Sequence, residues 1–353
     1  MLFPTDYADA RERFRELVSC ADFSLESHAH PTKKGPNGEN LACDIARLGA
    51  MDAKRVILIS SGTHGVEGFC GSGCQAELLA SGLLHGLPGD TAVVLVHAVN
   101  PYGFAWLRRT NEDNIDLNRN FVDHSVPHLN PGYDEIHDWL VPRDWSGPAR
   151  TEADASIDAY IADRGLRAFQ VAMTGGQYNH PDGLFYGGKA PAWSNLIWRK
   201  LLRKHCVNAE QVIGIDIHTG LGPRGVGEAI CVTSEAEYMK AKALFGEEVT
   251  WTGGGEAVSA QVGGSLLHAA HEEVGTERLV MIALEYGTYP IPETLEALRA
   301  ETWLVARGDA ASEQASRIKQ SLKDAFFIDE PDWKLAVTTR FMDLVLKIKG
   351  SLS

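Results

Sequence analysis

The chain has 353 residues, of which 44% are hydrophobic, enough for a large core, and it carries 33 Lys and Arg against 47 Asp and Glu. A formal net charge of −14 disfavours binding to the phosphate backbone of nucleic acids. No apolar stretch approaches the roughly 18 residues of a membrane-spanning helix, and the N-terminus MLFPTDYADARERF lacks the pattern of a secretory signal. We therefore expect a cytoplasmic protein that binds neither nucleic acid nor membrane.

In chain order, apolar runs and helical periodicities alternate along the sequence. The patterns predict a helix at 6–21 with Asp6 as N-cap, a strand at 55–62, a helix at 67–86, a strand at 91–99, helices at 151–165 and 190–205, strands at 211–220 and 228–234, a helix at 234–249, a strand at 278–287, helices at 292–308 and 312–327, and a helical tail from 330. The near-continuous apolarity of the strands indicates burial on both faces. This alternation predicts an α/β fold, a mixed, mostly parallel twisted sheet with helices on both faces.

Nothing in the sequence marks a domain boundary. We find no Pro/Ser-rich linker, no block of like charge and no repeat of fixed period. The segment 121–151 is rich in Pro, Trp and His, and we interpret it as a long ordered loop. The prediction is thus a single domain spanning 1–353.

Four polar side chains stand at the carboxyl ends of predicted strands. His64 and Glu67 follow the first strand, His218 lies near the end of 211–220, and Glu285 near the end of 278–287. Ligands of open α/β sheets bind at such strand ends, so these residues can converge on one cleft. Two imidazoles and one carboxylate are the protein ligands of a catalytic zinc that keeps a fourth position open. Taken singly, Glu67 is equally explained as a first-turn acid, and His218 as a buried core histidine.

Glycines and arginines surround these candidates. The glycines at 62, 65 and 68 permit a tight backbone path around His64 and Glu67. The stretch RRTNEDNIDLNRNF (108–121) concentrates arginines, which suit a substrate carboxylate or a developing oxyanion. The alternative is a structural loop in which these arginines pair with Asp113 and Asp116.

Four motifs occur in an order that resembles the zinc carboxypeptidase superfamily. They are THGVEG, NPYGFAWLRRTNEDNIDLNRNF, DIHTG and LEYGT, and together they cover roughly residues 50 to 290. The sequence is most similar to a bacterial branch of that superfamily known mainly as predicted metallopeptidases. The resemblance implies a zinc-carboxypeptidase-like fold and one Zn²⁺ ion held by His64, Glu67 and His218.

The same resemblance implies roles for further residues. Glu285 matches the catalytic carboxylate, and Arg108 matches the arginine that polarises the scissile carbonyl, with Arg109 as the alternative. Asn118 and Arg119 match the pair that binds a substrate's terminal carboxylate.

One expected residue of the superfamily, the substrate-capping tyrosine, has no good equivalent. Tyr238 is the only tyrosine between His218 and Glu285, and its surroundings are helical. A Gly-rich insert, TGGQYNHPDGLFYGG (174–188), precedes the third ligand instead. Tyr178, His180 or Tyr186 of this insert are candidates to line the cleft, and we take Tyr178 as a substrate-binding residue. Turn formation alone also explains the composition of the insert.

The sequence therefore predicts a zinc-dependent hydrolase that cleaves an amide bond next to a carboxylate-bearing residue. A metallocarboxypeptidase acting on peptides is the first interpretation. An N-acyl amino acid deacylase, similar to aspartoacylase or succinylglutamate desuccinylase, is the alternative, and a non-catalytic zinc- or ligand-binding module is the alternative of another class. The sequence leaves open the oligomeric state and whether a second metal ion binds.

Overall fold

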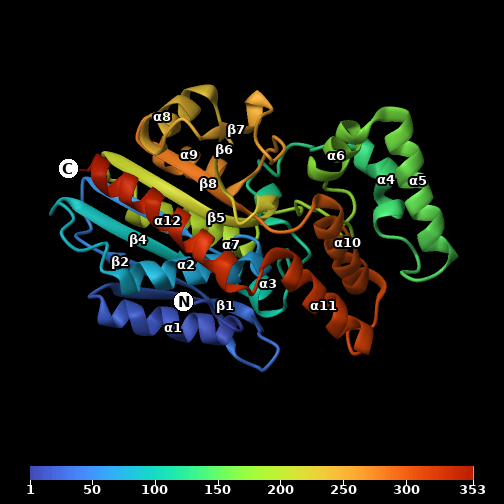
Figure 1. The fold of residues 1–353 in the computed structure, drawn as a ribbon, viewed down its shortest axis with the longest axis horizontal. Coiled ribbons are helices and arrows are strands. Elements are labelled where there is room, and N and C mark those ends of the chain that lie inside the picture. Colours follow the sequence, from blue (N-terminus) through green and yellow to red (C-terminus); the bar gives the residue numbers. More distant parts are fainter. Residues whose placement is uncertain (353) are drawn as a thin grey trace.

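The predicted strands form the centre of one sheet in the computed structural model, which describes residues 1–352 (Figure 1). The strands are β1 (Ser24–Lys34), β2 (Asn40–Leu48), β3 (Arg55–Ser60), β4 (Thr91–His97), β5 (Gln211–Arg224), β6 (Gly227–Cys231), β7 (Thr250–Trp251) and β8 (Leu279–Gly287). Their order is β1-β2-β4-β3-β5-β8-β6-β7, and the central strands β4, β3, β5 and β8 are parallel. The antiparallel pairs are β1 with β2, β2 with β4, and β6 with β8. The prediction of a mixed, mostly parallel sheet is confirmed.

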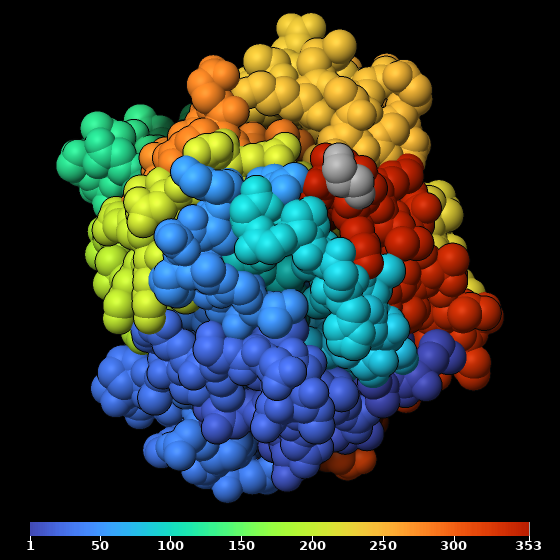
Figure 2. Space-filling model, turned by 90° about the vertical axis from the view of Figure 1, so that its left-hand side faces the viewer, coloured from blue at the N-terminus to red at the C-terminus, as the bar shows by residue number. Residues whose placement is uncertain are grey.

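Helices cover both faces of the sheet because its central strands are apolar on both sides. In β3, Ile57 and Ile59 enter one core while Val56 and Leu58 enter the other, as the alternation of a strand requires. The first core is closed by α1 (Tyr7–Cys20), α2 (Gly68–Ser81), α8 (Glu235–Phe245) and α12 (Pro331–Ser351). The second core is closed by α7 (Trp193–His205) and α9 (Leu266–Val274). Figure 2 shows the N-terminal part of the chain (blue) beside α12 (red) at one end of the molecule.

The remaining helices are α3 (Pro101–Ala105), α4 (Pro131–Leu140), α5 (Pro148–Arg164), α6 (Leu166–Thr174), α10 (Ile291–Arg307) and α11 (Glu313–Phe326). Helices α4, α5 and α6 form an outlying cluster with its own apolar core (Figure 1). The long ordered loop predicted for 121–151 is therefore wrong over 131–140, where α4 forms, and over 148–151, where α5 begins. The Asn130 side chain caps α4 by accepting a hydrogen bond from Tyr133 N, and Pro131 occupies its first turn. None of the helices described here is both long and apolar enough to cross a bilayer.

The sheet topology brings the candidate residues together. From β3 the chain moves to β4 on one side, and later to β5 and β8 on the other, so the strand order reverses between β3 and β5. Such a reversal creates a crevice at the carboxyl ends of the strands. The register aligns Ser60 of β3 with Asp216 of β5, and His218 of β5 with Glu285 of β8. Residues separated by more than 200 positions thus meet at one edge of the sheet.

Candidate metal centre

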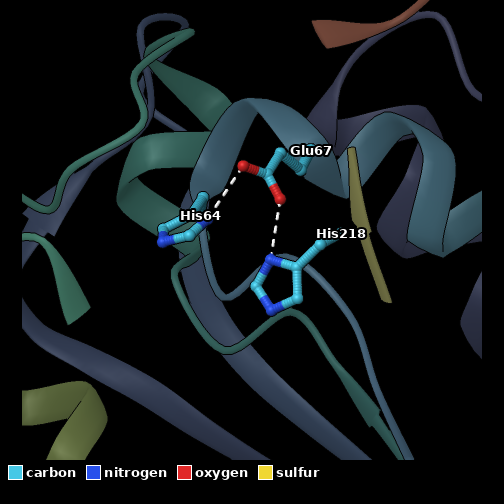
Figure 3. A group of neighbouring side chains, drawn as sticks. All are labelled: His64, Glu67 and His218. Atoms are coloured by element: carbon cyan, nitrogen blue, oxygen red, sulfur yellow. Dashed lines mark hydrogen bonds and ion pairs between the residues drawn. The ribbon is translucent and has the colours of Figure 1, made fainter. Parts of the chain in front are cut away.

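His64, Glu67 and His218 converge at this edge (Figure 3). Each residue offers a ligand atom within 4.8 Å of those of the other two. Glu67 lies between the imidazoles: its Oε1 is 2.8 Å from His64 Nδ1, and its Oε2 is 2.9 Å from His218 Nδ1. All three side chains are buried. The three side chains could thus hold one metal ion, with both Nδ1 atoms directed toward Glu67.

Glycines shape the turn that carries His64 and Glu67. Gly62 adopts a left-handed φ of +65°, which lets the chain turn after β3, and Glu67 lies in a short 3₁₀ helix, η1 (Gly65–Glu67). A Cβ on Gly65 would lie 2.0 Å from the carbonyl carbon of Gly103, so only glycine allows α3 to approach this closely. The backbone N–H of Gly65 donates to Arg109 O at 3.1 Å. The glycines thus allow the segment that carries Arg108 and Arg109 to pack against the turn that carries His64 and Glu67.

Asp216 orients His218 from the outside. Its Oδ2 is 2.6 Å from His218 Nε2, while its Oδ1 accepts hydrogen bonds from Ser60 Oγ (2.7 Å) and Thr63 Oγ1 (2.9 Å). A carboxylate that holds the outer nitrogen of a ligating histidine fixes both its tautomer and its ring orientation. Sequence reasoning overlooked Asp216, although its place two residues before His218 puts both side chains on one face of β5.

Asp116 and Arg109 compete for the outer nitrogen of His64. His64 Nε2 is 3.3 Å from Asp116 Oδ1 and 2.9 Å from Arg109 Nη2, and Arg109 Nε donates to Asp116 Oδ2 at 3.0 Å. Nε2 cannot donate to Asp116 and accept from Arg109 at once. If His64 gives the Nδ1 lone pair to a metal, Nε2 carries the proton and donates to Asp116. Asp116, like Asp216, was not among the predicted site residues.

The charges of the centre suit a divalent cation. Glu67, Asp116 and Asp216 are buried carboxylates, and Arg109 is the one guanidinium that contacts the ligands among the residues described, so neutral imidazoles leave two negative charges unbalanced. Burial alone would raise the pKa of Glu67, but His64 and His218 outweigh it and hold that pKa well below its usual range. Buried charges of one sign need a partner. A dication bound by two nitrogens and one oxygen meets both the charge and the donor set.

Glu285 lies beside the centre on the neighbouring strand. Its Oε1 accepts a hydrogen bond from Leu221 N at 3.1 Å, and its Cα pairs with that of His218 across β5 and β8. Burial, followed by the negative charge of Glu67, raises the pKa of Glu285 to about 8. The Glu285 carboxyl group is therefore held in place by the backbone, and its pKa depends on the charge of the metal centre.

The two adjacent arginines have different surroundings. Arg108 Nε donates to Glu301 Oε1 at 2.8 Å, and its Nη2 donates to Asn114 Oδ1 at 2.8 Å, in a buried network that also includes Lys319. Arg109 instead contacts His64, Glu67 and Asp116. The structure brings Arg109, and not Arg108, to the ligands.

The expected carboxylate-binding pair lies on a second short 3₁₀ helix, η2 (Leu117–Arg119). Arg119 Nε and Nη2 donate to Thr174 O, at 3.0 and 2.7 Å, and Nη1 donates to Asn118 O at 3.0 Å. Asn118 Oδ1 accepts from Leu266 N at 2.9 Å. Three of the five N–H groups of Arg119 are engaged, which leaves two for a ligand.

The insert 174–188 packs against this loop. Tyr178 donates its hydroxyl proton to Arg119 O at 2.7 Å, and the main-chain oxygen of Tyr186 accepts from Asp116 N. The Phe185 ring centroid lies 5.4 Å from the Cζ atoms of both Arg109 and Arg119, although sequence reasoning did not single this residue out. His180 lies away from this contact, next to α4.

One family model matches nearly the whole chain. The model of the family described as "Protein of unknown function (DUF2817)" matches residues 3–340. No curated protein matches the sequence. Similar solved structures include a carboxypeptidase A from Helicoverpa armigera (12% identity, 91% of this chain and 74% of that chain, TM-score 0.46). Two others are a candidate metallopeptidase from Shewanella denitrificans OS217 (11%, 86% and 90%, 0.40) and a candidate succinylglutamate desuccinylase/aspartoacylase family protein from Shewanella amazonensis SB2B (20%, 80% and 73%, 0.37).

Proposed function

Because this chain belongs to the DUF2817 family, whose description states no activity, we propose its function from its own site. It is a metal-dependent hydrolase that cleaves an amide bond next to a carboxylate-bearing residue, most simply a metallocarboxypeptidase. The observation that carries the proposal is the convergence of His64, Glu67 and His218 on one buried point, with Glu285 on the adjacent strand.

The three ligands would hold one Zn²⁺ ion, the metal favoured by two imidazoles and a carboxylate. When bound, zinc supplies Lewis acidity to the water and carbonyl oxygen beside it. Asp216 holds the proton on His218 Nε2, and Asp116 does the same for His64. Both Nδ1 lone pairs are thereby kept available for the metal.

Glu285 is the candidate general base and acid. Its Oε1 is fixed by Leu221 N, while Oε2 makes no hydrogen bond to the part of the chain that the structure describes. We expect Oε2 to accept a proton from the attacking water and to deliver it to the leaving nitrogen. Positioned carboxylates of this kind typically contribute a factor of about 10² to 10⁴.

Arg109 is the candidate oxyanion residue. Once the proton of His64 sits on Nε2, Arg109 Nη2 loses its acceptor there and can turn to a substrate oxygen. Its Nε stays anchored on Asp116. Arg108 cannot take this role without breaking its buried ion pair with Glu301.

The two unused N–H groups of Arg119 form the candidate binding site for the substrate carboxylate, and the amide nitrogen of Asn118 is a further candidate donor. Tyr178 would contribute indirectly, because its hydroxyl donates a hydrogen bond to Arg119 O and so holds the backbone of this binding site in place.

The insert also favours a second candidate function, the deacylation of N-acyl amino acids. Phe185 packs on both Arg109 and Arg119, and the metal ligands are only 1–4% exposed. Such a covered site accommodates a small substrate more easily than a peptide chain.

One experiment tests these functions together. The purified protein is assayed for zinc by elemental analysis, and for hydrolysis of C-terminally varied dipeptides and N-acyl amino acids with and without a chelator. We expect one zinc at this centre and hydrolysis that the chelator abolishes and added zinc restores. Bound zinc with no turnover on either panel would contradict the proposal and favour a non-catalytic binding module.

A further inference from the structure

We propose that His137, His180 and Asp182 form a second metal site, which takes a divalent transition ion such as Zn²⁺. Each of the three offers a ligand atom within 4.8 Å of the others. His137 belongs to α4, whereas His180 and Asp182 belong to the insert, so the ion would tie the insert to the outlying helical cluster. This inference does not depend on the proposed catalytic function.

The first observation that points to a bound ion is the lack of hydrogen bonds at the His137 side chain. Its side chain is only 8% exposed, yet within residues 1–352 neither of its ring nitrogens makes a hydrogen bond. Nδ1 is buried without a partner, and Nε2 lies 3.6 Å from Asp182 Oδ1, beyond hydrogen-bonding distance. The ion would bind at Nε2, the nitrogen that faces Asp182 and lacks a hydrogen bond although the side chain is buried.

The Nε2–Oδ1 separation itself fits a shared ion. Two ligands bonded to a tetrahedral zinc at about 2.0–2.1 Å stand about 3.4 Å from each other. A direct hydrogen bond would draw the same atoms to about 2.8 Å.

Backbone contacts hold the turn that carries the other two ligands. Asn114 Nδ2 donates to Pro181 O (3.0 Å) and Gly183 O (2.9 Å), and Gln177 Nε2 donates to His180 O (2.8 Å). The main chain is thus fixed while the side chains of His180 and Asp182 face α4. A fixed main chain lowers the entropic cost of binding an ion.

His180 must turn slightly for all three ligands to bind one ion. Its ring stacks on that of His137, with centroids 3.9 Å apart and planes 23° apart, so the in-plane lone pairs run side by side. The His180 side chain is 27% exposed and has room to rotate out of the stack. Asp134 Oδ1, 2.9 Å from His180 Nε2, can then serve as its orienting carboxylate or as a fourth ligand. The one cation near Asp182 among the residues described is Arg307, at 3.8 Å, which leaves the cluster short of positive charge.

An ion bound at this second site would be linked to the site at His64, Glu67 and His218 through the insert 174–188. Asp182 precedes Phe185 by three residues, and Phe185 packs on Arg109 and Arg119. An ion that links Asp182 to α4 would therefore hold the Phe185 ring in place against both arginines.

The test is a metal count on the full chain. Metal-free protein is titrated with Zn²⁺ and the bound metal is measured after desalting, for the wild type, the double variant H137Q/H180Q, the variant H64Q and the control H85Q. His85 is exposed and lies outside both clusters. We expect two equivalents for the wild type and for H85Q, and one equivalent for H137Q/H180Q and for H64Q.

A wild type that binds one equivalent, all of it lost in H64Q, would overturn the second site, as would equal metal counts in H137Q/H180Q and H85Q. If the double variant does not fold, the single variant Asp182→Asn decides, because its side chain is 45% exposed. We expect it to bind the second ion at least ten-fold more weakly, and an unchanged affinity refutes the site. The result is separate from that of the hydrolysis assay, since two bound ions without turnover would refute only the proposed function.

Discussion

Replacing Asp216 by Asn tests whether the orientation of His218 controls metal affinity. The Asn amide oxygen can still accept the hydrogen bonds of Ser60 and Thr63 that Asp216 Oδ1 accepts now. The amide nitrogen then takes the place of Oδ2, 2.6 Å from His218 Nε2. Because it is a donor, Nε2 must accept, and the proton of the neutral ring moves to Nδ1. That is the atom whose lone pair a metal needs.

We expect Asp216→Asn to weaken zinc binding about 10- to 100-fold, or about 1.4–2.7 kcal/mol, the usual effect of removing a partner of a ligating histidine. The assay is competition with a chromophoric chelator, together with circular dichroism of the metal-free protein to confirm folding. Asp52→Asn is the control, since Asp52 is exposed and precedes β3, at the opposite end of that strand from His64 and Glu67. A Kd within two-fold of the wild type for a folded Asp216→Asn variant would refute the role of Asp216.

Three further results follow from the site and the core. Glu285→Gln should lower kcat by about 10² to 10⁴ while zinc content stays unchanged, and loss of the metal instead would show that Glu285 is a ligand. Arg109→Met should lower kcat about 100-fold or more, whereas Arg108→Met should leave kcat largely unchanged and cost about 1–3 kcal/mol in urea denaturation, because the buried Glu301 keeps only Lys319 as a partner; the reverse pattern of kcat would exchange their roles. Burial lowers the pKa of His97 to about 4, so between pH 6.5 and 4 the unfolded chain is protonated at this residue while the native state is not. The free energy of unfolding should therefore fall by up to about 3 kcal/mol from pH 6.5 to 4. A His97→Gln variant whose free energy of unfolding falls equally with pH would contradict this.

The central strands could be predicted because burial on both faces leaves near-continuous apolar runs, whereas the outer strands β1 and β2 leave no such signal. Strand β1 is largely exposed and has no apolar pattern. Strand β2 contains Asp44 and Arg47, and burying Asp44 requires its ion pair with Arg11 on α1, which no local pattern announces. The predicted helix 67–86 also ends early, at Ser81, because Gly82 already adopts the left-handed conformation.

The convergence of the candidate ligands followed from the rule that parallel strands share their carboxyl ends. The choice between Arg108 and Arg109 could not be made from the sequence, because it depends on Glu301, a residue 193 positions away from Arg108. The same limit explains why the position of Phe185 within the site emerged only from the structure. Tertiary partners, and not local spacing, decide where such side chains point.

The long chain interval between the ligands has a consequence for biosynthesis. His218 is 151 residues downstream of Glu67, and β5 must insert beside β3 before the third ligand is in place. At about 5–20 residues per second, the ribosome needs about 8–30 s to make that interval. During this time the nascent protein exposes only two of the three candidate ligands, so a metal ion could be bound by all three only after the middle of the sheet has assembled.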